Sequence, residues 1–217
     1  MNQVSIVGID PSGPASPKAT GIAVFRFEQR KLALTETDCN GSDREILNLV
    51  AGLSSFGPVV VGLDAPLSYE AGGSLRARDR SLQQAIQGIG MLSRHVMAPL
   101  APRMAILTLR GVALSRLLSS SGNNNILLVE VHPSACLGLR GASLADVTTF
   151  KTQQGSRVNL IAWLGNQGLG GIQPTPDCSD HFVAACAAAL AAWKWYQGDS
   201  AWRVSAEPPW HPYDFTC

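Results

Sequence analysis

An unbroken apolar run at residues 58–63, followed by Asp64, constrains the fold more than any other feature of this 217-residue chain. The run lacks the alternation of polar and apolar residues found in a strand with one solvent-exposed face, so it predicts a central strand covered on both sides. A connection of about a dozen residues or more separates it from the earlier strands, which permits parallel pairing through a helical crossover. We therefore expect an α/β sheet with helices on both faces.

Four further strands are predicted, at residues 4–10, 20–27, 31–37 and 126–131. The first three are joined by connections short enough for an antiparallel meander. Residues 31–37 also alternate leucines with polar neighbours, as a half-buried edge strand does. The expected architecture is a mixed five-stranded sheet, in which three antiparallel strands are followed by two parallel ones.

Several segments have helical patterns. Ser42 and Glu45 have capping-box spacing and predict a helix to about Leu53. Residues 72–121 predict two or three helices, because Gly and Pro interrupt the pattern there. A helix is also suggested at 157–164, and the Ala-rich segment at 177–196 predicts a long final helix.

Neither repeats nor a low-complexity linker divide the chain. We therefore expect a single domain over residues 1–217, with a helical insertion at about 72–121 and a Pro/Trp-rich tail at 199–217.

Composition excludes two classes of protein. Hydrophobic residues make up 46% of the chain, enough for a sizeable core and too many for a disordered protein. A formal net charge of +1 argues against coating nucleic acid by bulk charge alone. The charge is uneven, however, since seven arginines and one acid lie between Arg76 and Arg116.

Five scattered cysteines without a C-x-x-C pair argue against a disulfide framework or a zinc knuckle. The first residues lack the cationic region of a signal peptide. The longest apolar run, residues 182–193, is too short to span a bilayer. We therefore expect a soluble cytoplasmic protein with no membrane partner.

Three acids, Asp10, Asp64 and Glu130, stand where predicted strands end. Ligands bind at the carboxyl ends of such strands in open α/β sheets. Asp177 and Asp180 are three residues apart and would share one face at a helix start, where an N-cap pair is the alternative interpretation. Converging carboxylates raise one another's pKa, and a hard divalent cation such as Mg²⁺ or Mn²⁺ relieves the repulsion. Paired ions of this kind can activate water for phosphoryl displacement.

The opening G-I-D-P-S at residues 8–12 and T-G-I-A-V at 20–24 resembles that of RNase H-like proteins, especially resolvases of the RuvC type. D-x-x-D at 177–180 before an Ala-rich helix resembles the C-terminal acids of those resolvases. The whole chain is more similar to domain-of-unknown-function family 429, described as predicted RNase H-like nucleases. The shared features are L-D-A-P-L-S at 63–68, R-D-R at 78–80, V-E-V-H-P at 129–133, F-K at 150–151, and Asp180.

The resemblance implies an RNase H-like fold and a metal site at Asp10, Asp64 and Asp180, with Glu130 and Asp177 as further catalytic acids. The chain departs from the pattern at His181, where such families usually carry Ala. The region from residue 76 to 121 has no counterpart in a minimal RNase H fold and resembles an elaboration covering the site.

Substrate contacts are expected from Thr20, Arg76, Arg78, Arg80 and Lys151. Arg suits bidentate phosphate recognition, although a solvated helix face is the alternative. Thr20 could simply begin a strand, and only the resemblance separates Lys151 from other surface lysines. His132 and His181 could be general bases, metal ligands or structural residues.

The leading hypothesis is a metal-dependent nuclease that hydrolyses phosphodiester bonds in nucleic acid of unknown type. One alternative is an actin-like ATP-binding phosphotransferase, which shares the Gly-Ile-Asp opening but needs two related domains. A second is a non-catalytic nucleic-acid-binding module with the same fold. The resemblance to resolvases also raises the expectation of a homodimer.

Overall fold

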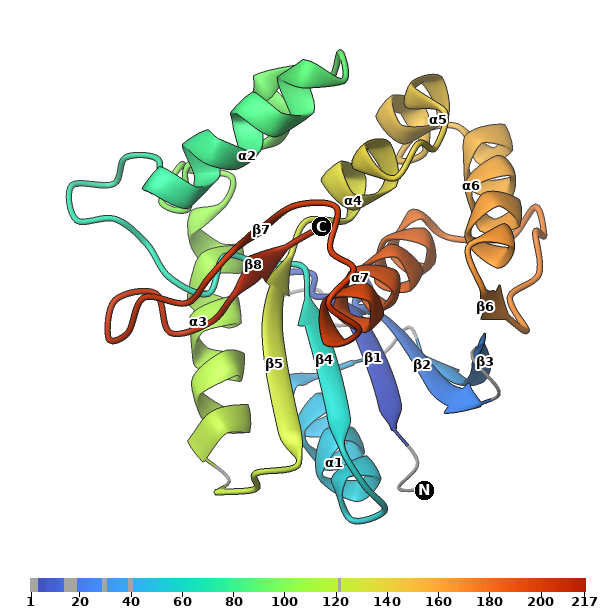
Figure 1. Ribbon diagram of the computed structural model, residues 1–217, viewed down its shortest axis with the longest axis horizontal. Coiled ribbons are helices and arrows are strands. Elements are labelled where there is room, and N and C mark those ends of the chain that lie inside the picture. The colour runs from blue at the N-terminus through green and yellow to red at the C-terminus, as the bar shows by residue number, and fades with distance from the viewer. Residues whose placement is uncertain (1–3, 14–18, 29–30, 39–40, 121) are drawn as a thin grey trace.

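The computed structural model describes residues 4–13, 19–28, 31–38, 41–120 and 122–217. Its centre is a mixed eight-stranded sheet with the order β6-β3-β2-β1-β4-β5-β8-β7 (Figure 1). The strands are β1 (Ser5–Asp10), β2 (Gly21–Glu28), β3 (Lys31–Asp38), β4 (Val59–Leu63), β5 (Ile126–Val131), β6 (Leu169–Gly170), β7 (Arg203–Val204) and β8 (Phe215–Thr216). The helices are α1 (Asp43–Ser54), α2 (Ala77–Gly88), the 3₁₀ helix η2 (Ser93–His95), α3 (Ala105–Ser120), α4 (Pro133–Leu139), α5 (Leu144–Thr149), α6 (Gln154–Asn166) and α7 (Asp180–Tyr196).

The five predicted strands form the middle of this sheet with the predicted directions. β2 is antiparallel to both β1 and β3, whereas β1, β4 and β5 run parallel. The expectation of five strands is nevertheless too low, because three two-residue strands extend the sheet at its ends. Strands that short have no measurable alternation, so hydrophobic periodicity does not reveal them.

The C-terminal tail is part of the sheet. β8 pairs parallel with β5, and β7 pairs antiparallel with β8. The tail is also held by its side chains, since the rings of Trp202 and Phe215 meet edge to face at 5.0 Å and Cys217 is buried. The two ends of the chain therefore contribute to one sheet.

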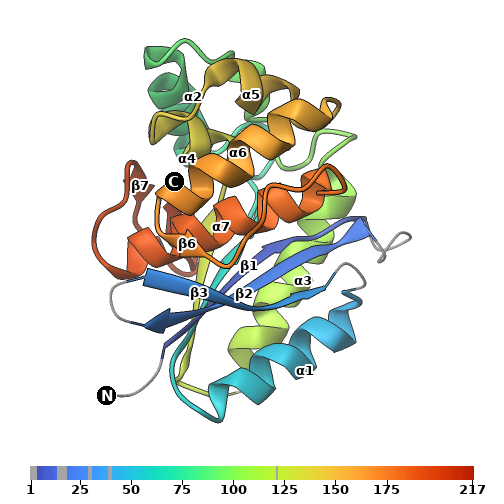
Figure 2. The same ribbon diagram turned by 90° about the vertical axis from the view of Figure 1, so that its right-hand side faces the viewer.

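Helices cover both faces of the sheet, as expected (Figure 2). α1 and α3 cover one face, where Val50 and Leu114 pack against strand residues such as Val61. α7 lies on the other face, and α4 and α6 pack on α7. None of the helices in the described part of the chain is both long and apolar enough to cross a membrane.

The helix boundaries agree with the sequence patterns except at α7. The capping box of Ser42 and Glu45 begins α1, and the segment at 72–121 contains α2, η2 and α3. α7 begins at Asp180, not at Asp177, because Ser179 is the residue whose side chain accepts from the amide of Phe182. The sequence patterns do not predict the short helices α4 and α5.

α7 lies directly against the backbone of the central strands. A Cβ at Gly8 would overlap the carbonyl oxygen of Ala185, and one at Gly62 would lie 2.5 Å from that of Ala188. A Cβ at Gly21 would likewise overlap the backbone of His181. Small residues on both sides thus allow the close approach, and the N-terminus of α7 is held beside the end of β1.

Candidate active site at the carboxyl ends of β1 and β4

Asp10 and Asp64 lie side by side where two parallel strands end. Ile9 is paired with Leu63, and the amide of Asp64 donates to the carbonyl of Ile9 at 2.9 Å, which extends the pairing by one residue. Both aspartates follow Gly8 and Gly62 by two positions, so their side chains project toward the α7 face. The structure brings these two sequence-predicted acids together.

Burial and mutual repulsion make this pair electrostatically unfavourable. The pKa of Asp64 is raised well above its usual value, first by burial and then by the charge of Asp10. The pKa of Asp10 is also raised, chiefly by burial, although His181 and Lys151 oppose the shift. A cation between the two carboxylates would therefore be stabilised by their charges.

The N-terminus of α7 adds two more ionisable groups. Nδ1 of His181 donates to Oδ2 of Asp10 at 2.8 Å, and this hydrogen bond raises the pKa of the imidazole. Asp180 is close enough for its charge to raise the pKa of Asp10, but it does not line the cavity described next. His181 therefore contacts Asp10 directly.

A cavity of about 350 Å³ opens at this edge of the sheet. Asp10 and Asp64 line it together with two exposed cationic side chains, Arg94 and Lys151. Much of the remaining wall is apolar and comes from Val96, Met97, Met104, Leu107, Val147 and Phe150. Its size is at the lower end of the roughly 300–1,000 Å³ that small-molecule pockets occupy.

Glu130 does not join the two aspartates. It is paired with Leu63, whose side chain packs on the α1 and α3 face, so strand alternation directs Glu130 away from Asp64. Oε1 accepts from Nη2 of Arg76 at 2.5 Å, and Oε2 accepts from Nη1 of Arg76 and from the amide of Leu67. Glu130 reaches the cavity wall, but both of its oxygens are occupied by protein donors.

Asp177 also lies apart from the others. It is exposed in the turn before α7 and does not line the cavity. The expectation that Asp177 and Asp180 share a helix face was wrong, because the three-residue spacing has that consequence only inside a helix. The N-cap interpretation was wrong for the same reason, since Ser179 is the cap.

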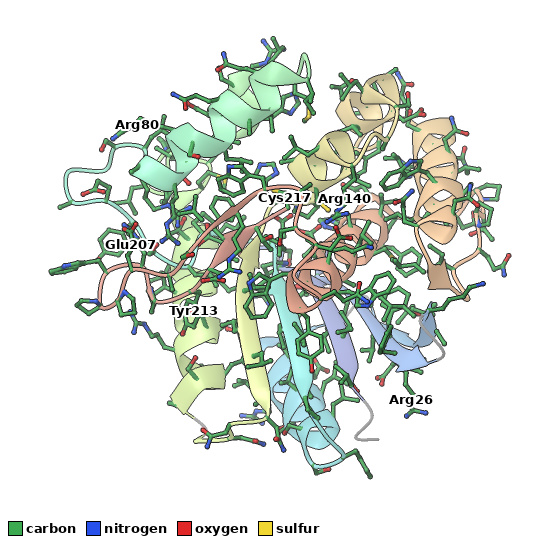
Figure 3. The ribbon with its side chains drawn as sticks, viewed as in Figure 1. Arg26, Arg80, Arg140, Glu207, Tyr213 and Cys217 are labelled. Carbon is green, nitrogen blue, oxygen red and sulfur yellow. The ribbon has the colours of Figure 1, made fainter. Side chains whose placement is uncertain are left out.

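The arginines proposed to grip phosphate have other partners. Arg76 is buried between Asp79 and Glu130, and Nη2 lies 2.6 Å from Oδ1 of Asp79. Arg78 is buried as well, and its guanidinium donates to the carbonyls of Ser205 and Tyr213 in the tail. Figure 3 places Arg80 on the outer side of α2, where it is exposed and does not line the cavity. Arg76 does line the cavity, but its guanidinium, like that of Arg78, is already bound to protein acceptors. The expected substrate contact of these three arginines stays a prediction.

Thr20 has a structural partner too. It is buried, and its Oγ1 accepts from Nη1 of Arg110 at 2.9 Å. Arg110 also forms an ion pair with Asp43 at 2.7 Å and donates to the carbonyl of Ser12. This cluster fixes the chain that follows Asp10, and nothing in the local sequence singles out Arg110 from the other arginines of its segment.

His132 has both ring nitrogens engaged by the backbone. Nδ1 accepts from the amide of Ala135 at 3.2 Å, and Nε2 donates to the carbonyl of His95 at 2.9 Å. Burial lowers the pKa of this imidazole, which keeps it neutral. His132 is therefore a structural residue that caps α4, and His181 is the histidine that contacts an active-site carboxylate.

The carboxylates fit a magnesium or manganese site with few protein ligands better than a site in which the protein supplies every ligand. Within the ranges that the structure describes, no three His, Cys, Asp or Glu side chains form a group that could hold a metal ion. Mg²⁺, however, is commonly bound by only one or two carboxylates, with waters and substrate phosphates as its other ligands. Asp10 and Asp64 supply two such carboxylates beside a cavity.

Comparison with known proteins identifies a family but no function. A family model described as "Protein of unknown function (DUF429)" matches residues 8–209 of the chain. Neither the curated proteins nor the solved structures include a match.

Proposed function

The chain belongs to domain-of-unknown-function family 429, and from the carboxylate pair in its cavity we propose that it is a metal-dependent nuclease that hydrolyses phosphodiester bonds. The observation that carries the proposal is the placement of Asp10 and Asp64 at adjacent strand ends, with their pKa values raised. We also propose that the fold is RNase H-like, which the three antiparallel and two parallel strands at the centre of the sheet support.

Asp10 and Asp64 would hold the metal ion, Mg²⁺ or Mn²⁺, with Asp180 contributing negative charge from outside the cavity. The ion would supply activation of a water molecule and neutralisation of charge on the scissile phosphate. The hydrogen bond from His181 to Oδ2 orients the Asp10 carboxylate, so that Oδ1 is the oxygen left for a ligand.

Lys151 and Arg94 are the cationic groups that would bind the phosphate. Both line the cavity and are exposed, whereas Arg76, which also lines it, and Arg78 are buried. Lys151 is also close enough to both active-site aspartates for its charge to lower their pKa values. In this proposal the phosphate lies between the carboxylate pair and these two side chains.

The test is a metal titration with single-stranded and double-stranded DNA and RNA. We expect cleavage that requires Mg²⁺ or Mn²⁺ and that falls at least about 100-fold in Asp10→Asn and in Asp64→Asn, the scale of losing one electrostatic contact to a transition state. Asp177→Asn is the matched control, because it removes an exposed carboxylate outside the cavity. Cleavage that is absent in the wild type, or equal in Asp10→Asn, would show that the proposal is wrong.

A non-catalytic binding module gives a different result. It would bind nucleic acid with the usual salt dependence, and Asp10→Asn would bind as well as the wild type.

The cytoplasmic location and the homodimer that the sequence suggests remain predictions. Light scattering on a sizing column would check the dimer.

A further inference from the structure

We propose that the cavity holds one unpaired nucleotide, so that the substrate is single-stranded nucleic acid or a free nucleotide rather than continuous duplex. The inference rests on the proposed function and adds the substrate class. It follows from the limited exposure of the carboxylate pair and from how the cavity wall is divided between charged and apolar side chains.

The carboxylates line a cavity whose walls come from several parts of the chain, and they are largely shielded from solvent. Asp10 keeps only 17% of its side-chain surface exposed. Figure 1 shows α2, α4 and α5 above the carboxyl ends of β4 and β5. The cavity is lined by Pro133 at the start of α4, by Phe150 after α5 and by Val96 after η2. The segment at 72–121 thus covers the edge of the sheet where the carboxylates emerge.

A continuous duplex fits this arrangement poorly. Its phosphates lie along the outside of a stiff cylinder, and its grooves are about 12 Å and 6 Å wide. A phosphate on that cylinder would meet the rim of the cavity before it reached Asp10 and Asp64. Enzymes that act on a nucleotide within a pocket therefore use single-stranded substrate or extrude the nucleotide from the duplex.

The cavity lining has a charged part and an apolar part, as a nucleotide has a charged phosphate and a flat, largely apolar base. One part is charged and contains the two aspartates with Lys151 and Arg94, beside Arg76 and the two carboxylates paired with it, Asp79 and Glu130. The other part is apolar, and within it Met97 and Met104 offer flexible, polarizable side chains that adapt to a flat ring. A phosphate would occupy the charged part and a base the apolar part. The volume of about 350 Å³ suits one such unit.

The first experiment compares substrates of one sequence: a linear single strand, a circular single strand, a blunt duplex, and adenosine 5′-monophosphate as a binding probe. We expect the linear single strand to be cleaved at least about tenfold faster than the duplex. Cleavage of the circular strand would identify action within the chain, and its absence would identify action at ends. Equal rates on duplex and single strand would overturn the inference and leave the proposed nuclease function intact.

The second experiment tests the nucleotide pocket independently of the nuclease proposal, because it measures binding without cleavage. Binding of adenosine 5′-monophosphate is measured by calorimetry with the wild type in Mg²⁺ and with Asp10→Asn, which needs no turnover. If nothing is cleaved but the nucleotide binds in the cavity, the nuclease proposal fails and the nucleotide pocket stands. If the nucleotide does not bind to either protein, the inference is overturned.

A cavity-filling variant tests where the nucleotide lies. Met97 lines the cavity and is 38% exposed, so Met97→Trp should fill the apolar part and leave Asp10 and Asp64 in place. We expect nucleotide affinity and single-strand cleavage to fall about tenfold relative to the wild type. Leu109→Trp is the control, because Leu109 is 66% exposed on α3 outside the cavity. Equal nucleotide affinity in Met97→Trp and Leu109→Trp would contradict placement of the base in the apolar part of the cavity.

Discussion

Arg76 and Glu130 form a buried ion pair in which Nη2 lies 2.5 Å from Oε1 and Nη1 lies 2.9 Å from Oε2. Asp79 and Ser68 accept further hydrogen bonds from the same guanidinium. The cluster ties the start of α2 to the end of β5, beside the cavity that contains Asp64. It therefore holds the covering segment in place over the site.

Removing Arg76 should strongly destabilise the protein. Arg76→Ala leaves Asp79 and Glu130 buried without their partner, and breaking a buried ion pair from one side typically costs about 3–5 kcal/mol. Arg80→Ala, four residues further along, removes an exposed arginine and should change the free energy of unfolding by less than about 0.5 kcal/mol. Urea unfolding measures both, and equal midpoints for the two variants would contradict a structural role for Arg76.

A single added methyl group between α7 and the sheet should also destabilise the fold. The Cβ of Gly62→Ala would lie 2.5 Å from the carbonyl oxygen of Ala188, which is backbone and cannot move aside alone. Overpacking of this kind typically costs about 1–3 kcal/mol. Gly52→Ala in α1 meets no atom within 4 Å and should be neutral or stabilising, by up to about 1 kcal/mol. Thermal unfolding of the two variants checks the contrast.

Asp64→Asn should stabilise the metal-free protein at neutral pH. The pKa of Asp64 is raised on folding, so the folded state binds more protons than the unfolded state, and stability falls as the pH rises from about 3.8 through the raised value. Asn removes this loss, and we expect a gain in the free energy of unfolding at pH 7 that disappears near pH 3.8. Urea unfolding across this pH range, in the presence of a chelator, measures the difference. A variant less stable than the wild type at pH 7 would contradict the repulsion inferred for the carboxylate pair.

His211 should make attachment of the tail sensitive to acid. Oγ of Ser68 accepts from Nη1 of Arg76 and donates to Nδ1 of His211 at 2.7 Å, so the imidazole must stay unprotonated at Nδ1. Burial, then the charges of Arg78 and Arg76, lower its pKa, so the folded state binds fewer protons and stability is lost as the pH falls below 6.5.

His211→Gln retains an acceptor without the titration and provides the comparison. We expect the wild type to lose more stability than His211→Gln between neutral pH and the range below 6.5, measured by urea unfolding. The other histidines are common to both proteins and do not contribute to the difference. If the free energy of unfolding had the same pH dependence in the wild type and in His211→Gln, this role of His211 would be excluded.

Much of the fold could be predicted because its signals are local. The unbroken apolar run of β4, the alternation of β3 and the capping box of Ser42 each lie within a few residues. The adjacency of Asp10 and Asp64 followed from the same reasoning, since parallel strands end at one edge of a sheet. The two-residue strands β6, β7 and β8 could not be predicted, because their pairing depends on distant partners.

The sequence alone determined the five central strands with their order along the chain, and the two acids at the ends of parallel strands. Only the tertiary structure decided which charged residues are available for chemistry. Arg76 and Glu130 are 54 positions apart, and their spacing along the chain gives no sign that they neutralise each other. Charge is a property of a residue, but burial and pairing depend on contacts between segments that are remote in the sequence. For that reason Lys151 and Arg94, rather than Arg76 and Arg78, lie exposed beside the carboxylates.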